Sequence, residues 1–151
     1  MNKPWLSILT PTYNGERYLA SALKSIIAQE DPNIECIIVD DGSTDATLSI
    51  LNDYKNKLPL KLIQRERVGN WVTNTNYALS VASGEYVCFL HQDDLWLRGR
   101  LETMKNLIEQ FPKTNIFLHP SYFIDDKGKR LGIWRCPLPN YPLKIDPRLL
   151  I

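Results

Sequence analysis

The sequence predicts an α/β protein in which helices cover both faces of a mostly parallel sheet. Short apolar runs alternate four times with segments whose apolar residues recur at three- and four-residue spacing, and each such pair indicates a strand followed by a helix. The 151 residues are 44% hydrophobic and 23% charged, which fits one globular domain over residues 1–151 and excludes a disordered or collagen-like chain.

Two strand-helix units are expected in the first part of the chain. The first strand is expected at 6–9, and the helix after it carries apolar residues at helical spacing: Leu19, Ala22, Leu23, Ile26 and Ile27. The second strand, at 34–39, is apolar almost throughout, as expected of a strand buried on both faces. Ser43 or Thr44 is expected to cap the next helix, which carries Leu48, Leu51 and Leu58.

Two further units follow, and the pattern then changes. A strand at 60–63 and a helix around 74–82 come first, with Gly84 as a left-handed helix end. A strand at 86–90 precedes a helix that carries Leu101, Met104, Ile108 and Phe111 and stops at Pro112. Beyond it, strands are expected at 116–118, 122–124 and 131–134, with a turn at 126–128, whereas 137–151 has no readable period.

Charge and cysteine content limit the function classes. A formal net charge of +1 gives no overall field for nucleic acid or an anionic membrane. No apolar run is long enough for a transmembrane segment and no signal peptide is visible, so a cytoplasmic location is expected. Cys36, Cys88 and Cys136 are interpreted as buried or free thiols in preference to disulfides or a metal site.

Polar clusters follow each of the four predicted parallel strands. In open parallel sheets, ligands bind beyond the carboxyl ends of the strands. Asp41 and Asp93 are therefore expected at one edge, together with backbone amides and Arg side chains from 65–70. Carboxylates at such an edge can hold a divalent cation, and Mg²⁺ typically combines one or two of them with substrate phosphates.

Each of these signals also has a structural explanation. The segment 40–45 is rich in turn and cap residues, and an acidic pair such as 93–94 is favoured at the start of a helix. His91 and His119 are more often hydrogen-bonded residues than ligands. For Trp71, Trp96 and Trp134 core packing is the default expectation.

Three motifs in order resemble the family 2 glycosyltransferases. They are SILTPTYN at 7–14, VDDGSTD at 39–45 and GEYVCFLHQDDLW at 84–96, and the resemblance runs from about residue 5 to residue 135. It implies a Rossmann-like GT-A fold, a nucleotide-diphosphate sugar as donor, with a UDP-sugar favoured, and inversion at the anomeric carbon. It also implies a saccharide or lipid-linked acceptor in cell-surface polysaccharide synthesis, which could place the cytoplasmic protein at the inner membrane face.

The resemblance also assigns site residues. Pro11 and Tyr13 would line the nucleotide pocket with Gln92, and Asp41 would bond the base or the ribose. The segment 69–76, which contains Asn70, would flank the diphosphate. The Asp-x-Asp motif of the family falls on 91–93, where His91 replaces the first acid, and Asp93 keeps the position that contacts Mn²⁺ or Mg²⁺.

An inverting transfer also requires a general base for the acceptor hydroxyl. The only acids after Glu109 are Asp125, Asp126 and Asp146, and 125–128 is typical of a turn. The catalytic base is therefore expected beyond Ile151, in a domain that is truncated at the C-terminus, binds donor and transfers little. The alternatives are a non-catalytic nucleotide-sugar-binding remnant and a Mg²⁺-dependent phosphoryl-transfer domain.

Overall fold

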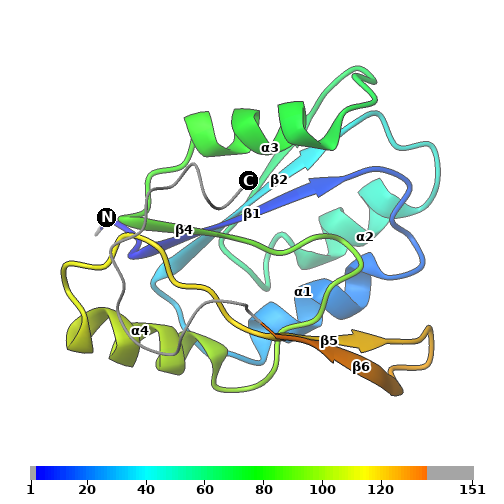
Figure 1. Cartoon of the computed structure of the whole chain (residues 1–151). Helices are drawn as coiled ribbons and strands as arrows, with labels where there is room; N and C mark the ends of the chain where they lie inside the picture. Colours follow the sequence, from blue (N-terminus) through cyan, green and yellow to red (C-terminus); the bar gives the residue numbers. More distant parts are fainter. Residues whose placement is uncertain (1–2, 136–151) are drawn as a thin grey trace. The chain divides into compact units, whose positions relative to one another are not determined.

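The computed structural model describes residues 3–135 (Figure 1). These residues form two compact units, with the boundary after Thr103. The elements of the first unit, in chain order, are β1 (Leu6–Thr12), α1 (Leu19–Ile27), β2 (Ile34–Asp40), α2 (Thr47–Tyr54), β3 (Leu60–Gln64), α3 (Trp71–Ser80) and β4 (Tyr86–Phe89). The boundary falls within α4 (Arg100–Gln110), and the second unit contains β5 (Ser121–Ile124) and β6 (Arg130–Trp134). One domain over 1–151 stays a prediction.

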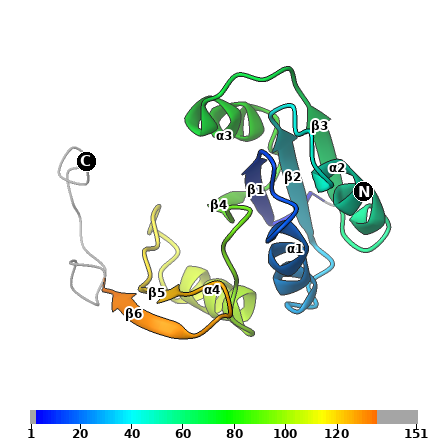
Figure 2. The same cartoon turned by 90° about the vertical axis from the view of Figure 1, so that its right-hand side faces the viewer.

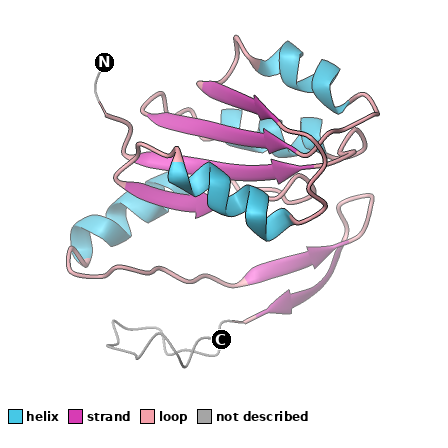
Figure 3. Cartoon of the chain, turned by 90° about the horizontal axis from the view of Figure 1, so that it is seen from above, coloured by secondary structure: helices cyan, strands magenta, loops and turns pink. Residues whose placement is uncertain are grey.

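The first unit confirms the predicted parallel sheet. Its four strands have the order β3-β2-β1-β4, all three pairs are parallel, and the arrows point the same way (Figure 3). The chain steps from β1 to β2 to β3 in one direction and then returns past β1 to β4. Because such crossovers are right-handed, this reversal places α1 and α2 on one face and α3 on the other (Figure 2).

The core lies on both faces of the two central strands. All seven residues of β1 are buried, and six of the seven in β2 are, which explains the nearly continuous apolar sequence. On the α3 face, Leu9, Ile37 and Val39 pack against Ala78. The strands that carry the site are thus held from both sides.

The predicted cap of α2 is wrong. The helix begins at Thr47 without a cap from its own N-cap side chain. Instead, the Ala46 N–H donates to Glu16 and the Thr47 N–H donates to Asp45. Ser43 lies too early because it belongs to the turn after β2, and Leu58 is buried but follows the end of the helix.

The predicted role of Gly84 is also wrong. Its backbone is not left-handed, and α3 ends before it at Ser80. A Cβ at Gly84 would lie 2.6 Å from the backbone nitrogen of Ser7, so close approach to β1 is what requires glycine here. The start of α3 was predicted too late, because Asn70 caps it by accepting hydrogen bonds from the Val72 and Thr73 N–H groups.

Two of the three predicted core tryptophans are exposed. Trp96 is buried, but Trp71 is 62% exposed and Trp134 is 43% exposed. Trp71 is the first residue of α3 and lies at its exposed end, while Trp134 ends a two-stranded hairpin whose strand residues are all exposed. His119 is hydrogen-bonded, as expected, because its Nδ1 lies 2.9 Å from the Pro120 carbonyl oxygen.

The second unit contains the predicted hairpin, but the strand predicted before it, at 116–118, does not form. β5 and β6 are antiparallel around the turn at 125–128. Residues 116–118 form no strand, because no described strand pairs with them, and β propensity alone does not hold a strand. The segment 137–151 and Cys136 lie outside the described residues.

Cys36 and Cys88 are buried free thiols, as predicted. Both are in register with Ile8, one on each side of β1, so a whole strand separates them and prevents a disulfide. Burial raises the pKa of each thiol to about 12, which leaves both unreactive. Within residues 3–135, no helix has the length and apolar character needed to cross a membrane.

Candidate functional site

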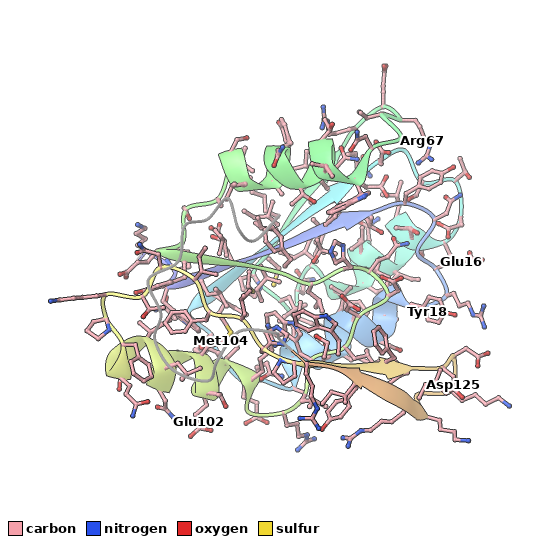
Figure 4. All side chains as sticks on the ribbon, in the orientation of Figure 1. Glu16, Tyr18, Arg67, Glu102, Met104 and Asp125 are labelled. Carbon is pink, nitrogen blue, oxygen red and sulfur yellow. The ribbon has the colours of Figure 1, made fainter. Side chains whose placement is uncertain are left out.

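The polar loops gather at the carboxyl edge of the parallel sheet, as expected. β1 is flanked there by the loop after β2 and the loop after β4, because the strand order reverses between β1 and β4. Such a switch point is where open α/β sheets bind ligands. Glu16, after β1, and Arg67, after β3, both lie at this end of the sheet (Figure 4).

Asp41 is buried and holds the loop after β3. It is 3% exposed, and its carboxylate accepts hydrogen bonds from the Val68 N–H at 2.7 Å and the Gly69 N–H at 2.8 Å. Burial acts to raise the pKa of Asp41, but these hydrogen bonds, together with the Asn74 side chain and the charge of Arg67, outweigh it and hold the pKa below its usual value. Asp41 is therefore ionised at neutral pH.

Arg67 connects Asp41 with the loop after β1. Its guanidinium lies 3.3 Å from the Asp41 carboxylate and 3.2 Å from the centroid of the Tyr13 ring, while about half of the side chain remains exposed. The predicted grouping of Asp41 with backbone amides and an arginine is thus confirmed. The stacking of Arg67 on Tyr13 was missed, because no sequence spacing relates a residue after β3 to one after β1.

Asp40 performs a different task from Asp41. Its carboxylate accepts hydrogen bonds from the backbone and the hydroxyl of Ser43, and it is 1% exposed. Gly42 has a φ of +74°, a left-handed conformation that suits glycine in this turn. The structural explanation of the segment 40–45 therefore holds for Asp40, whereas Asp41 faces the loop after β3.

The loop after β1 is locked to the loop after β2. The Asn14 N–H donates to the Ser43 hydroxyl, and the Asn14 side chain accepts from the Thr44 N–H, both at 2.9 Å. The Gly15 N–H donates to the hydroxyl of Thr47 at 2.7 Å. These contacts hold the residues that follow Tyr13 against the residues that follow Asp41.

Asp93 is a free carboxylate at this edge. It is exposed, and among residues 3–135 none donates a hydrogen bond to it or pairs with it. The adjacent Asp94 interacts electrostatically with Arg100. No group of three or more His, Cys, Asp or Glu in the described part of the chain could hold a metal on its own. One free carboxylate fits a cation whose other ligands are phosphates and water.

Gln92 directs its side chain at the loop after β1. Its Oε1 accepts from the Thr12 hydroxyl at 2.6 Å and from the Tyr13 N–H at 2.9 Å, and its Nε2 donates to the Tyr13 carbonyl at 3.2 Å. Direct contact between Gln92 and a nucleotide stays a prediction. The sequence alone did not reveal that this amide is already bound within the protein.

The remaining predicted residues line the same edge. Pro11 is a buried residue of β1, and the Asn70 side-chain oxygen is engaged at the start of α3. The His91 ring packs edge-on against Trp71, with 5.5 Å between ring centroids. Asp41 follows β2 and Asp93 follows β4, so β1 lies between the two strands that carry these carboxylates.

A parallel sheet of this order, with helices on both faces, is an α/β fold of the Rossmann-like GT-A class, which solved glycosyltransferase structures share. The sequence model of the family described as "Glycosyl transferase family 2" matches residues 7–148, so the chain belongs to this family.

Two curated relatives are informative. A stretch of 101 residues is 40% identical to the putative teichuronic acid biosynthesis glycosyltransferase TuaG of Bacillus subtilis, covering 66% of this chain and 40% of that protein. A stretch of 107 residues is 44% identical to the poly(ribitol-phosphate) beta-N-acetylglucosaminyltransferase TarS of Staphylococcus aureus, covering 69% of this chain and 19% of that protein. The chain thus spans less than half the length of either relative.

Solved structures show the same fold. The crystal structure of S. aureus TarS 1–349 in complex with UDP-GlcNAc has a TM-score of 0.68 and 37% identity, over 71% of this chain and 32% of that one. The mannosyltransferase PcManGT from Pyrobaculum calidifontis, in complex with GDP-Man and Mn²⁺, has a TM-score of 0.64 and 28% identity, over 83% and 37%.

Proposed function

We propose that this chain is the donor-binding part of an inverting glycosyltransferase that uses a nucleotide-diphosphate sugar, with a UDP-sugar favoured, and a divalent cation. The observation that carries the proposal is the placement of Asp41 and Asp93 on opposite sides of β1 at the switch point. Asp41 is ionised and pairs with Arg67, which stacks on Tyr13, whereas Asp93 is exposed and free of partners among the described residues. A single ligand that carries both a base and a diphosphate would contact both carboxylates, the second through a cation.

The two carboxylates would perform different parts of donor binding. Asp41 can accept a hydrogen bond from a nucleobase or ribose, and Tyr13 offers a ring on which a base can stack. Asp93 would hold Mn²⁺ or Mg²⁺ with the diphosphate. Such a cation stabilises the negative charge that develops on the leaving diphosphate. The N-terminal end of α3, at Asn70, would flank the phosphates.

The contacts of the acidic pair favour donor binding over phosphoryl transfer. An acidic Mg²⁺ pocket needs both Asp40 and Asp41 available for the ion. The Asp40 carboxylate is occupied by the backbone N–H and the hydroxyl of Ser43, so only Asp41 of this pair would remain for an ion. In addition, β3 ends at Gln64 instead of an acceptor Asp.

The acceptor is proposed to be a saccharide or lipid-linked sugar in cell-surface polysaccharide synthesis, at a cytoplasmic location. The names of TuaG and TarS, which concern teichuronic acid and poly(ribitol-phosphate), support this class of acceptor. The general base for the acceptor hydroxyl is not assigned to a residue of this chain.

Thermal unfolding in the presence of nucleotides tests the proposal. A ligand at 100 times its Kd stabilises the folded state by about 2.7 kcal/mol, so binding raises the Tm. We expect UDP and UDP-GlcNAc with Mn²⁺ to raise the Tm by several degrees, and AMP, which lacks both the diphosphate and the pyrimidine, to leave it unchanged. An equal response to all three nucleotides would contradict the proposal.

A transfer assay separates the enzyme from a binding remnant. A radiolabelled UDP-sugar is incubated with Mn²⁺ and candidate acceptors, using both this chain and a longer protein that contains it. Sugar appearing on an acceptor supports a transferase. Donor binding without transfer by either protein would instead support the non-catalytic alternative.

A further inference from the structure

The backbone does not connect the ends of β1 and β4. β4 pairs with β1 only as far as Leu9 and Phe89, and the last backbone hydrogen bond runs from the Leu90 N–H to the Leu9 carbonyl. β1 continues to Thr12 along β2. Pro11 lies two residues after Leu9 and so faces the same side, where it has no N–H to offer. The two strands therefore separate where the site begins.

The Gln92 side chain spans this separation. Its three hydrogen bonds go to Thr12 and Tyr13, and they use both acceptor positions of its oxygen. The place that it occupies is closely fitted, because a Cβ at Gly15 would lie 2.6 Å from the Gln92 oxygen. A side-chain amide here replaces the backbone pairing that β1 and β4 lack.

A continuous chain of contacts runs through Gln92 from one half of the site to the other. The Asp41 N–H donates to the Thr12 carbonyl at 2.9 Å. Thr12 and Tyr13 bind the Gln92 amide, and Gln92 is covalently joined to Asp93. Beyond the last backbone hydrogen bond between β1 and β4, Gln92 therefore links the loop that carries Tyr13 to the loop that carries Asp93.

We infer that Gln92 is a positioning residue that sets the spacing between the nucleoside contacts at Tyr13 and Asp41 and the cation contact at Asp93. The inference rests on the proposed function. A ligand that bridges both contacts, such as UDP with Mn²⁺, depends on that spacing, because a preorganised site does not lose affinity to reordering. Uridine would contact only the nucleoside half of the site, so its affinity should not depend on that spacing.

The test compares bridging and non-bridging ligands in the Gln92→Met variant, which keeps the length of the side chain and loses its hydrogen bonds. Calorimetry with the whole chain measures Kd for uridine, for UDP with EDTA and for UDP with Mn²⁺. We expect the uridine Kd to stay within about twofold. The Kd for UDP with Mn²⁺ should rise at least about tenfold, which is about 1.4 kcal/mol.

Gln29→Met is the matched control for lost hydrogen bonds. Gln29 also makes three, to Ser25, Leu97 and Leu101, but none of them reaches the loop after β1. We expect it to lower the Tm and to leave the ratio of the uridine and UDP affinities unchanged.

Gly15→Ala gives an independent perturbation, should Gln92→Met fail to fold. Its methyl group displaces the Gln92 amide without changing that residue, and circular dichroism checks that the variant is folded. We expect the same selective loss of UDP binding with Mn²⁺.

Three results would overturn the inference. An equal loss of uridine and UDP in the folded variants would show that Gln92 contacts the nucleoside or merely supports the loop. If Mn²⁺ increased the affinity for UDP as much in both variants as in the wild type, the spacing would not depend on Gln92. A wild-type chain that gains nothing from Mn²⁺ would contradict the proposed function itself, and the inference with it.

Discussion

Asp40 and Asp41 show how two adjacent carboxylates take different roles when successive side chains leave the end of a strand in different directions. Asp40 ends β2 and binds Ser43, so it shapes the turn. Asp41 follows it and binds the amides of Val68 and Gly69. The sequence predicts that the pair lies at the edge of the sheet. It does not show which carboxylate faces the ligand, because both residues are typical of turns.

Replacing Asp41 tests its assignment to the nucleoside. We expect Asp41→Ala to weaken uridine and UDP by similar factors, each about tenfold, because both ligands contain the group that this carboxylate would bind. Calorimetry gives both constants. Asp53→Ala, which removes an exposed carboxylate of α2, is the matched control and should change neither. A loss confined to UDP with Mn²⁺ would make Asp41 a cation ligand instead.

At the scale of elements, the amino end of the sheet is held by Glu35. Its carboxylate accepts hydrogen bonds from the Ser7 hydroxyl, from the backbone and hydroxyl of Ser83 and from the Gly84 N–H. The network ties the start of β1, the start of β2 and the turn before β4 together. The network lies at the opposite end of the strands from the candidate site. A substitution of Glu35 should therefore change the stability of the protein without changing ligand binding.

Glu35 should make the stability of the protein dependent on pH. Partial burial acts to raise the pKa of Glu35, but the hydrogen bonds from Ser7, Ser83 and Gly84 outweigh it and hold the pKa below its ordinary 4.5. A lowered folded pKa contributes stability that is present above the unfolded value and is lost as the pH falls through the folded value.

Denaturant unfolding of Glu35→Gln at several pH values measures this contribution. At pH 7 we expect its free energy of unfolding to be lower than that of the wild type by about 1–3 kcal/mol. Below pH 4.5 the difference should shrink. A difference that stays constant down to pH 3 would show that the charge of Glu35 does not contribute.

Close packing between β1 and the turn before β4 predicts the effect of a larger residue at Gly84. Gly84→Ala places a methyl group 2.6 Å from the Ser7 backbone, which cannot move without disturbing a central strand. We expect a loss of about 1–3 kcal/mol and a lower Tm. Gly132→Ala, whose methyl would meet its nearest neighbour at an ordinary 3.7 Å, is the control, and an equal Tm for both variants would refute the packing argument.

At the scale of the whole molecule, the parallel sheet and the placement of Asp41 and Asp93 at its carboxyl edge could be predicted from sequence. Periodicity identifies strands and helices, and every parallel strand has its carboxyl end at the same edge. The order β3-β2-β1-β4 could not be predicted, because pairing partners leave no local signal. Gly84 was misread for a related reason. A glycine required by a distant backbone and a glycine that ends a helix look the same in the sequence.

The central claim is that a free carboxylate after β4 makes nucleotide binding dependent on a divalent cation. The most direct measurement is the Kd of UDP with Mn²⁺ and with EDTA for three proteins: the wild type, Asp93→Asn and Asp94→Asn. Each variant removes one negative charge, at adjacent positions, but of the two residues only Asp93 lacks a partner within residues 3–135.

We predict that Mn²⁺ tightens UDP binding at least about tenfold, about 1.4 kcal/mol, in the wild type and in Asp94→Asn. Asp93→Asn should lose most of that gain. Equal affinities with Mn²⁺ and with EDTA in the wild type, or a full gain in Asp93→Asn, would contradict the claim.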